Sequence, residues 1–267
     1  MIRLTEQPIT QAAQTQLRKY QQTIDDILDY AGQVAFAKTE FGKRNKTTNR
    51  SFKTVKKSLT TMCSGSRRCM YCEDSCADEV EHIQPKDLYP DVVFAWSNYL
   101  YSCGPCNGGK NNKYALIAAN DDLLDITRKR NQPIIRPPLG DHALINPRLE
   151  DPMLLLAIDL RDTFNFVPFP AISTRQQRRA QFTIDVLELN RDILPPARKD
   201  AYGSFRARLR EYISLRDNGS SPNDLETLVM SLKRLQHPTV WHEMKRQHNL
   251  IPELKKLFTQ APEALGW

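Results

Sequence analysis

The sequence predicts an α+β fold that is predominantly α-helical, and three observations carry this prediction. Apolar residues recur at intervals of three and four in the first and last parts of the 267-residue chain, which is the spacing of amphipathic helices. Residues 69 to 114 combine short strand signals, turns and two close pairs of cysteines. Between residues 133 and 170 prolines are too frequent for long helices. We therefore expect N-terminal helices, a small central unit and a helical C-terminal region.

Composition and charge narrow the classes of protein. The chain has 38 Lys and Arg against 31 Asp and Glu, a net charge of +7, which weakly favours a nucleic acid as partner. The first residues contain no apolar secretion signal, and the longest strongly apolar stretch, Met153 to Ile158, is too short to cross a membrane. We expect a soluble cytoplasmic protein. In such a chain, six cysteines indicate metal binding or catalysis and not disulfides.

The N-terminal part predicts two helices. The first is marked by apolar residues at helical spacing: Leu17, Tyr20, Ile24, Ile27, Leu28, Ala31 and Val34. The second is marked by Phe52, Val55, Leu59 and Met62, and it lies in a stretch between Gly42 and Cys72 that has nine basic residues and no acidic one. Three of these basic residues, Lys53, Lys56 and Lys57, are candidate phosphate contacts, and the alternative is a helix face that only meets water.

The second half of the chain predicts mainly helices. A helix is expected at Asp121 to Arg130 and a strand at Leu154 to Leu160. Further helices are expected near residues 176 to 189, 195 to 217, 222 to 235 and 238 to 258, where turn sequences separate the periodic segments. The expected divisions are an N-terminal helical and basic segment at 1–62, a core at 63–125, and a proline-rich connector with the helical C-terminal region at 126–267.

Four of the cysteines form two C-x-x-C pairs, Cys69 with Cys72 and Cys103 with Cys106. Each pair lets one tight turn present two thiolates to a tetrahedral ion, and four soft ligands of this kind suit zinc. A site closed by four sulfurs leaves no open position, so this zinc is expected to be structural. The alternative is two unrelated buried or redox-active turns. Cys63 and Cys76 are left over, and Cys76 is a competing candidate ligand.

The 30 residues between the two pairs contain a strand signal at Val80 to Ile83 and another at Tyr99 to Ser102, followed by a helix that begins near Asn107. This order predicts a β-β-α unit whose ends are held together by the zinc. The unit would bring Glu81, His82, Asn98 and Asn107 close to one another. Adjacent strand residues point to opposite faces, so Glu81 and His82 can share a site only at a strand end.

The segment from residue 69 to residue 113 resembles the HNH endonuclease family. The resemblance rests on the two C-x-x-C pairs, on Glu81-His82, on Trp-x-Asn98, on Asn107 directly after the last cysteine, and on Lys110. It implies a zinc-pinned ββα-metal core in which His82 is the general base, Glu81 and Asn107 bind a catalytic Mg²⁺ or Mn²⁺, and Asn98 holds the histidine loop. The chain departs from the common family pattern in having Asn107 where many members have histidine.

The implied chemistry is sound on physical grounds. A neutral imidazole can take a proton from water as the water attacks phosphorus, and a divalent ion held by oxygens offsets charge on the scissile phosphate. Lys110 and Lys113, beside the expected metal, are candidate phosphate contacts. The rival interpretation is a non-catalytic zinc ribbon that only binds nucleic acid, and the pair of Glu81 and His82 speaks against it.

Looser features extend the resemblance to the PtuB group, the HNH subunits of Septu and retron-associated antiphage systems. They are the Met-Ile-Arg-Leu start, the Cys-x-Tyr-Cys-Glu opening that ends at Glu73, and the segments 144–152 and 179–190. This resemblance implies a defence effector that acts with an ATPase of the PtuA type, and it allows for a retron reverse transcriptase with its RNA and DNA as a further partner. DNA is the favoured substrate, with RNA such as transfer RNA as the alternative.

Overall fold

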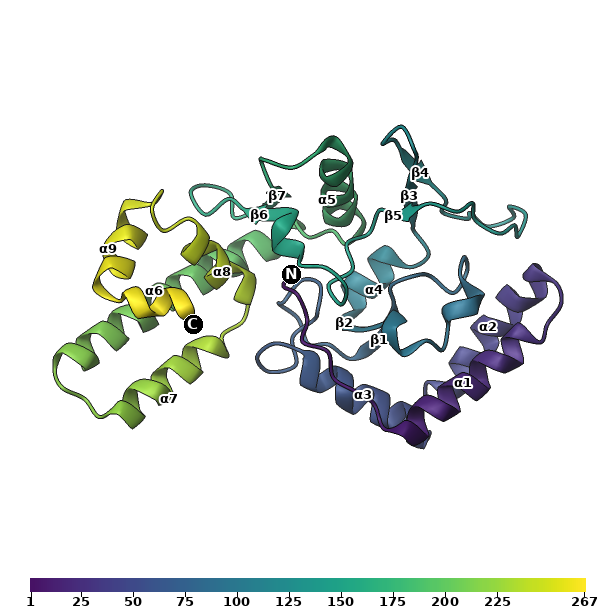
Figure 1. The fold of residues 1–267 in the computed structure, drawn as a ribbon, viewed down its shortest axis with the longest axis horizontal. Helices are drawn as coiled ribbons and strands as arrows, with labels where there is room; N and C mark the ends of the chain where they lie inside the picture. Colours follow the sequence, from purple (N-terminus) through teal and green to yellow (C-terminus); the bar gives the residue numbers. More distant parts are fainter.

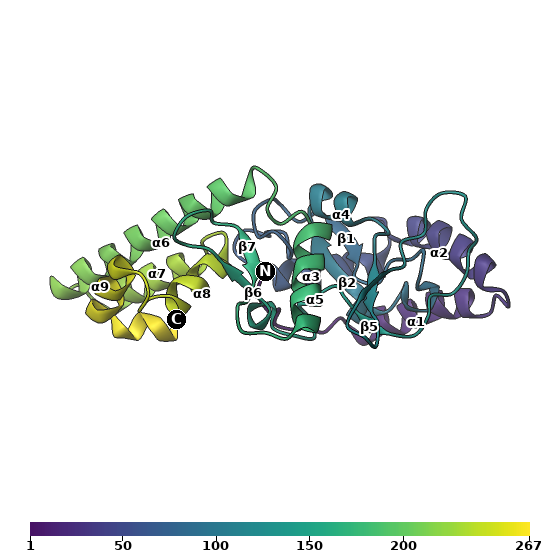
Figure 2. The same ribbon diagram turned by 90° about the horizontal axis from the view of Figure 1, so that it is seen from above.

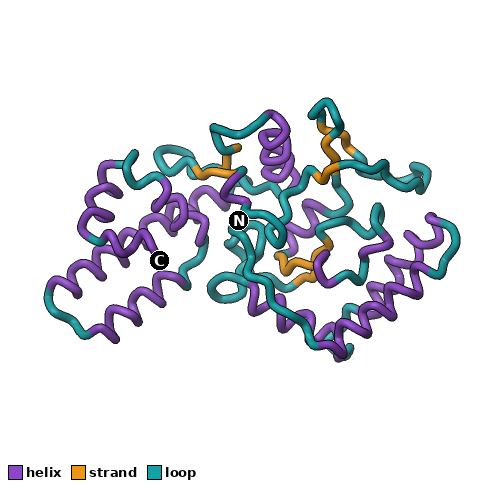
Figure 3. Tube along the Cα trace, in the orientation of Figure 1, coloured by secondary structure: helices purple, strands orange, loops and turns teal.

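The computed structural model describes residues 1–267 and contains nine α-helices and seven short strands. Helices occupy both ends of an elongated molecule, and the strands lie between them (Figures 1 and 2). The strands are few and short compared with the helices (Figure 3). The predicted α+β class is confirmed, and helices contain far more residues than strands. No helix combines the length and the apolar character that a membrane crossing requires.

Three helices form the N-terminal part: α1 (Gln11–Asp25), α2 (Tyr30–Arg44) and α3 (Arg50–Met62). The prediction of one continuous helix through Val34 was wrong, because the chain turns between α1 and α2. Asp29 caps the new helix by accepting a hydrogen bond from the Gly32 amide at 2.7 Å, and Leu28 is fully exposed in the turn. Helix α3 is confirmed, and it buries the four predicted apolar residues: Phe52, Val55, Leu59 and Met62.

The central unit is an antiparallel hairpin followed by a short helix. Strand β1 (Glu79–His82) pairs with β2 (Tyr99–Ser102), with Glu81 opposite Leu100. Two 3₁₀ turns, η1 (Pro90–Val92) and η2 (Trp96–Asn98), shape the connection, and α4 (Gly104–Lys110) follows β2. Helix α3 packs on β2, and α4 contacts β1. The predicted ββα order is confirmed, although α4 begins three residues before Asn107.

The proline-rich middle of the chain forms small sheets. Strands β3 (Ala115–Ile117), β4 (Leu123–Asp125) and β5 (Asp141–His142) make one sheet in the order β4-β3-β5. The helix predicted at 121–130 was wrong, because a tight turn at 118–122 returns the chain as β4, with the Ala118 amide donating to the Asp122 carbonyl at 2.8 Å. After η3 (Pro152–Leu154), β6 (Leu156–Ile158) pairs with β7 (Phe166–Pro168), so the strand predicted at 154–160 is confirmed in its centre.

The C-terminal region is helical, as predicted. It contains α5 (Thr174–Val186), α6 (Leu194–Asp217), α7 (Pro222–Lys233), α8 (Pro238–Arg246), α9 (Pro252–Gln260) and the 3₁₀ turn η4 (Pro262–Gly266). The single helix predicted at 238–258 is two helices, because Pro252 lacks an amide hydrogen and starts a new helix instead of continuing α8. Helices α6 and α7 run side by side at the far end of the molecule (Figure 1).

One hydrophobic core joins these parts. A cluster of 56 buried residues extends from Met1 to Ala264 and includes side chains from both ends of the chain. Arg148 makes one of the polar links across it. Its guanidinium forms an ion pair with Glu6 at 2.5 Å and donates to the backbone carbonyls of Trp96 and Tyr99, the latter at 2.8 Å. The N-terminal segment, the hairpin connection and the middle of the chain therefore meet at one buried cation.

We predict that Arg148→Leu lowers the free energy of unfolding by about 3 kcal/mol, since two buried carbonyls lose their charged donor. The melting temperature should fall by roughly 5–10 °C in a chain of this size. The matched control is Arg208→Leu, which removes an exposed ion pair with Glu211 at 3.1 Å and should change stability by less than about 1 kcal/mol. Equal melting temperatures for the two variants would contradict the assignment of Arg148 as a buried link.

Candidate metal centres and active site

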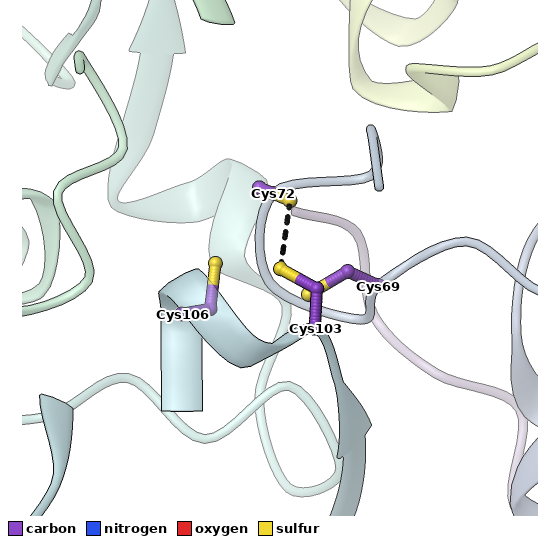
Figure 4. Close-up of side chains that lie close together, drawn as sticks. All are labelled: Cys69, Cys72, Cys103 and Cys106. Atoms are coloured by element: carbon purple, nitrogen blue, oxygen red, sulfur yellow. Dashed lines mark hydrogen bonds between the residues drawn. The ribbon is translucent and has the colours of Figure 1, made fainter. Parts of the chain in front are cut away.

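The four predicted cysteine ligands converge at one point. Cys69 and Cys72 lie on the loop before β1, whereas Cys103 precedes α4 and Cys106 lies in its first turn (Figure 4). All four are buried, and their sulfur atoms lie within 4.8 Å of one another. The Cys72 and Cys103 sulfurs are 3.8 Å apart, which is about the separation that a tetrahedral ion with 2.3 Å bonds to sulfur requires. This cluster could hold a structural zinc ion.

The two remaining cysteines lie outside the cluster. Cys63 is half-buried and Cys76 is exposed, and neither belongs to the group of converging sulfurs. Burial raises the pKa of the Cys63 thiol to about 12, so this side chain is a thiol and not a thiolate at neutral pH. Cys76 instead accepts a hydrogen bond from Arg67 at 2.9 Å. The expectation of Cys76 as a competing ligand therefore has no support in the geometry.

The cysteine cluster also contacts the C-terminal region. Glu73, directly after Cys72, accepts hydrogen bonds from the Thr239 amide at 3.0 Å and hydroxyl at 2.6 Å. On the other side, the Arg191 guanidinium donates to the Cys106 sulfur at 3.6 Å. A guanidinium here offsets negative charge on the thiolates, because four thiolates bound to Zn²⁺ carry a net charge of about −2. Sequence reasoning missed Arg191, which is 85 residues from Cys106 and has no motif around it.

A polar pocket of about 450 Å³ opens beside this cluster. It lies between β1, α4, the segment from Pro85 to Asp87 and one residue of α2, and none of its lining residues is hydrophobic. The lining residues are Lys38, Glu79, Glu81, His82, Pro85, Lys86, Asp87, Gly104, Asn107, Gly108, Asn111 and Asn112. Three residues singled out from the sequence, Glu81, His82 and Asn107, thus share one pocket. Asn98 and Lys110 do not line it.

His82 ends β1 and is almost fully buried. Its ring packs edge-on against Phe41 and Tyr99, with centroids 4.3 and 5.2 Å apart. The Nε2 atom lies 3.0 Å from the Val93 carbonyl, and because a carbonyl only accepts, Nε2 must carry the hydrogen. Nδ1 is then the unprotonated nitrogen, and it has no partner within the protein. Burial, with the nearby Lys86 ammonium, holds the pKa of His82 well below its usual value, so the ring is neutral.

Glu81 and Lys110 form a buried ion pair, with the ammonium 2.6 Å from Oε1. Burial raises the pKa of Glu81, and the charge of Lys110 offsets part of this effect. The Lys110 ammonium also donates to the His82 carbonyl at 2.8 Å, and its side chain has no exposed surface. The expectation for Lys110 was a phosphate contact. In the structure this residue instead joins α4 to β1 through the Glu81 carboxylate and the His82 carbonyl.

Asn98 connects the two segments that surround the histidine. Its Oδ1 accepts a hydrogen bond from the Gln84 amide at 2.8 Å, and its Nδ2 donates to the carbonyls of Gln84 and Val92, each at 3.1 Å. Gln84 follows His82 by two residues, and Val92 precedes the carbonyl that binds the His82 ring. A single buried amide therefore sets the distance between the histidine and its backbone partner.

Asn107 lies in α4 and reaches across to the strand. Its Nδ2 donates to Glu79 Oε2 at 2.6 Å. Glu79 was not singled out from the sequence, although its position offered a signal: it is two residues before Glu81, so both carboxylates point to the same side of β1. The pairs Glu79 with Asn107 and Glu81 with Lys110 join the strand to successive parts of α4.

Other charged groups surround the pocket. Lys86 is close to Glu81, and burial lowers its pKa, although the Glu81 charge opposes this shift. Asp87 forms ion pairs with Lys38 of α2 at 2.5 Å and with Arg128 at 3.3 Å. These residues were also missed, because Lys38 and Arg128 come from outside the segment with the C-x-x-C pairs, and Lys86 and Asp87 lie within it but belong to no motif. Together they place at least two ammonium groups, those of Lys38 and Lys86, at a pocket that also holds carboxylates.

The other expected phosphate contacts lie away from the pocket lining. Lys53 and Lys57 are exposed on α3 and Lys56 is half-buried there, and no carboxylate is within 4.0 Å of any of the three ammonium groups. Lys113 is exposed after α4. Helix α3 packs against β2, which is the strand paired with β1. The structure thus keeps these lysines available at the surface of the hairpin unit but does not bring them into the pocket.

One segment of the chain resembles a known protein. No protein-family model matches the chain. Over 57 residues, 20% of its length, the chain is 44% identical to Septu protein PtuB of Bacillus thuringiensis. The match is partial on both sides. It covers 22% of the PtuB protein, so the similarity concerns one segment of each protein and not the whole of either.

We predict that Cys103→Ser releases bound zinc and lowers the melting temperature, since the binding energy of a structural zinc is also folding energy. Zinc per chain, measured by elemental analysis of protein purified without chelator, should fall from about one toward zero. Cys76→Ser is the matched control, because this cysteine is exposed and outside the cluster. Zinc that is absent from the parent protein, or retained in Cys103→Ser, would exclude a four-cysteine zinc site.

Proposed function

We propose that the protein is a metal-dependent endonuclease of the HNH type, which hydrolyses phosphodiester bonds in nucleic acid. The observation that carries this proposal is His82, which lines a polar pocket with oxygen ligands beside it and has a neutral ring whose buried Nδ1 has no partner within the protein. A histidine that served only to fill the core would be expected to pair both of its ring nitrogens. A module that only grips phosphate would not need buried Glu81 there either.

His82 acts as the general base in this proposal. Its Nδ1 takes a proton from a water molecule, the water oxygen forms a bond to phosphorus, and the bond from phosphorus to the departing sugar oxygen breaks as that oxygen takes a proton from solvent. The Val93 carbonyl, bound to the opposite nitrogen, keeps the ring in the required tautomer and stabilises it when it becomes charged. Asn98 maintains this contact through its hydrogen bonds to Gln84 and Val92.

The pocket residues fit a divalent cation. Glu81 supplies a carboxylate and Asn107 an amide oxygen, and Mg²⁺ and Mn²⁺ prefer oxygen ligands. When bound, such an ion would offset charge on the scissile phosphate and on the departing oxygen. Lys86 and Lys38 supply positive charge at the pocket for the same phosphate. Lys110 holds Glu81 in place, and we assign phosphate contacts outside the pocket to Lys113 and to the lysines of α3.

The similarity to Septu protein PtuB supports a role in antiphage defence, and by that similarity we propose an ATPase of the PtuA type as partner. A retron reverse transcriptase stays a further candidate partner that no contact in the structure supports. DNA is the proposed substrate, and RNA is the alternative because the site acts on a phosphate that both polymers share. The non-catalytic zinc-ribbon module is the competing function.

We predict that His82→Ala reduces cleavage of plasmid DNA or total RNA by at least about 100-fold, because proton transfer to the base is lost. Bound zinc and nucleic-acid binding should stay at parental values. His82 packs against Phe41, so His82→Gln, which preserves more volume, is the second variant and should be equally inactive. The control is His248→Ala, which changes a histidine of the C-terminal region, and this variant should cleave like the parent. Parental activity in both His82 variants would favour the binding module.

We predict that replacing Lys53, Lys56 and Lys57 together by Gln weakens nucleic-acid binding and flattens its dependence on salt. On duplex DNA, the slope of log affinity against log salt should fall by about 0.9 for every phosphate that is no longer neutralised, so the expected change is about 2 to 3. The control replaces Lys199, Lys255 and Lys256, which are exposed on C-terminal helices. An unchanged slope in the α3 variant would mean that this face only meets water.

A further inference from the structure

The side-chain amide of Asn107 has two ends of opposite polarity. Its oxygen can bind a cation, whereas its NH₂ group carries partial positive charge and repels one. A histidine at the same position would offer a nitrogen lone pair instead. A chain with asparagine here therefore needs a contact that decides which end of the amide faces the pocket.

Glu79 makes that contact. A carboxylate oxygen accepts hydrogen bonds, so the amide end that lies 2.6 Å from Oε2 is the NH₂ group. The oxygen of Asn107 then points away from Glu79, and it accepts no hydrogen bond from the rest of the protein. The contact spans 28 residues of sequence and joins β1 to α4, so its geometry is held by two elements that are themselves fixed.

The neighbouring Glu81–Lys110 contact differs from the Glu79–Asn107 contact. Glu81 is buried against the Lys110 ammonium, whereas Glu79 is exposed and has no cation within ion-pair distance. An exposed glutamate without a positive partner gains little by ordering its side chain, and its partner here is a neutral amide. The side-chain contact of Glu79 is thus directed at the amide of Asn107, whose orientation it selects.

We propose that Glu79 is a positioning residue that turns the Asn107 amide so that its oxygen faces a divalent cation in the pocket. This inference rests on the metal site of the proposed function. Partners of this kind typically change metal affinity by 10-fold to 100-fold when they are removed. Glu79 acts through Asn107, so its effect depends on the residue at position 107.

The experiment measures Mn²⁺ binding to the full-length, zinc-loaded protein by electron paramagnetic resonance, without substrate. Glu79→Ala should weaken Mn²⁺ binding by about 10-fold or more. Glu79→Gln should also weaken it, since a glutamine can either accept from the NH₂ group of Asn107 or donate to its oxygen, and so no longer selects one orientation of the amide. The matched control is Asp78→Ala, which removes the adjacent exposed carboxylate and should change the affinity by less than about 3-fold, as expected for screened surface charge.

The decisive arm uses Asn107→Asp, whose two oxygens make orientation irrelevant. In that background, Glu79→Ala should weaken Mn²⁺ binding by less than about 3-fold, and the difference between the two backgrounds measures the coupling. Equal losses in both backgrounds would overturn the positioning role and leave Glu79 acting by charge alone. Unchanged binding in Glu79→Ala would also overturn it. A parent protein that binds no Mn²⁺ in the pocket would instead refute the metal site itself.

Discussion

Four cysteine sulfurs lie within 4.8 Å of one another, and as thiolates they would repel one another strongly. Four thiolates at this distance repel, and in a buried site only a cation bound between them or protonation relieves that repulsion. A zinc ion would relieve it and would fix the start of β1 to the start of α4. Apart from Lys38 of α2, the residues that line the candidate active site lie on β1, on α4, on the chain between them or directly after α4. The pocket geometry therefore depends on the cysteine cluster.

The same cluster connects the two ends of the molecule. Glu73 binds Thr239 at the start of α8, and Arg191 reaches Cys106 from the segment between α5 and α6. The loop that carries two of the sulfurs is thus held by the C-terminal region on one side and by the hairpin on the other. Because a shared hydrophobic core also crosses this junction, the helical C-terminal region is part of what keeps the cluster closed.

The sequence predicted which segments form helices and strands, but not where several of these elements begin and end. Phe52, Val55, Leu59 and Met62 predicted α3 because a single amphipathic face repeats without interruption. The same reasoning merged α1 and α2, since apolar periodicity continues through Leu28 although that side chain is exposed. It also made a helix of the segment that forms β4, where pairing with β3 overrides helical preference. Apolar periodicity shows which face of a helix is apolar, but it does not show where a turn ends that helix.

For the site, the sequence by itself determined which four cysteines converge and the neighbourhood of Glu81, His82, Asn98 and Asn107, because metal-ligand spacing and strand order are short-range properties. Only the tertiary structure decided the state of each group. The free nitrogen of His82 depends on the Val93 carbonyl, and the burial of Lys110 depends on β1, 28 residues away. Protonation, orientation and burial are set by such distant neighbours, and no local pattern in the sequence specifies them.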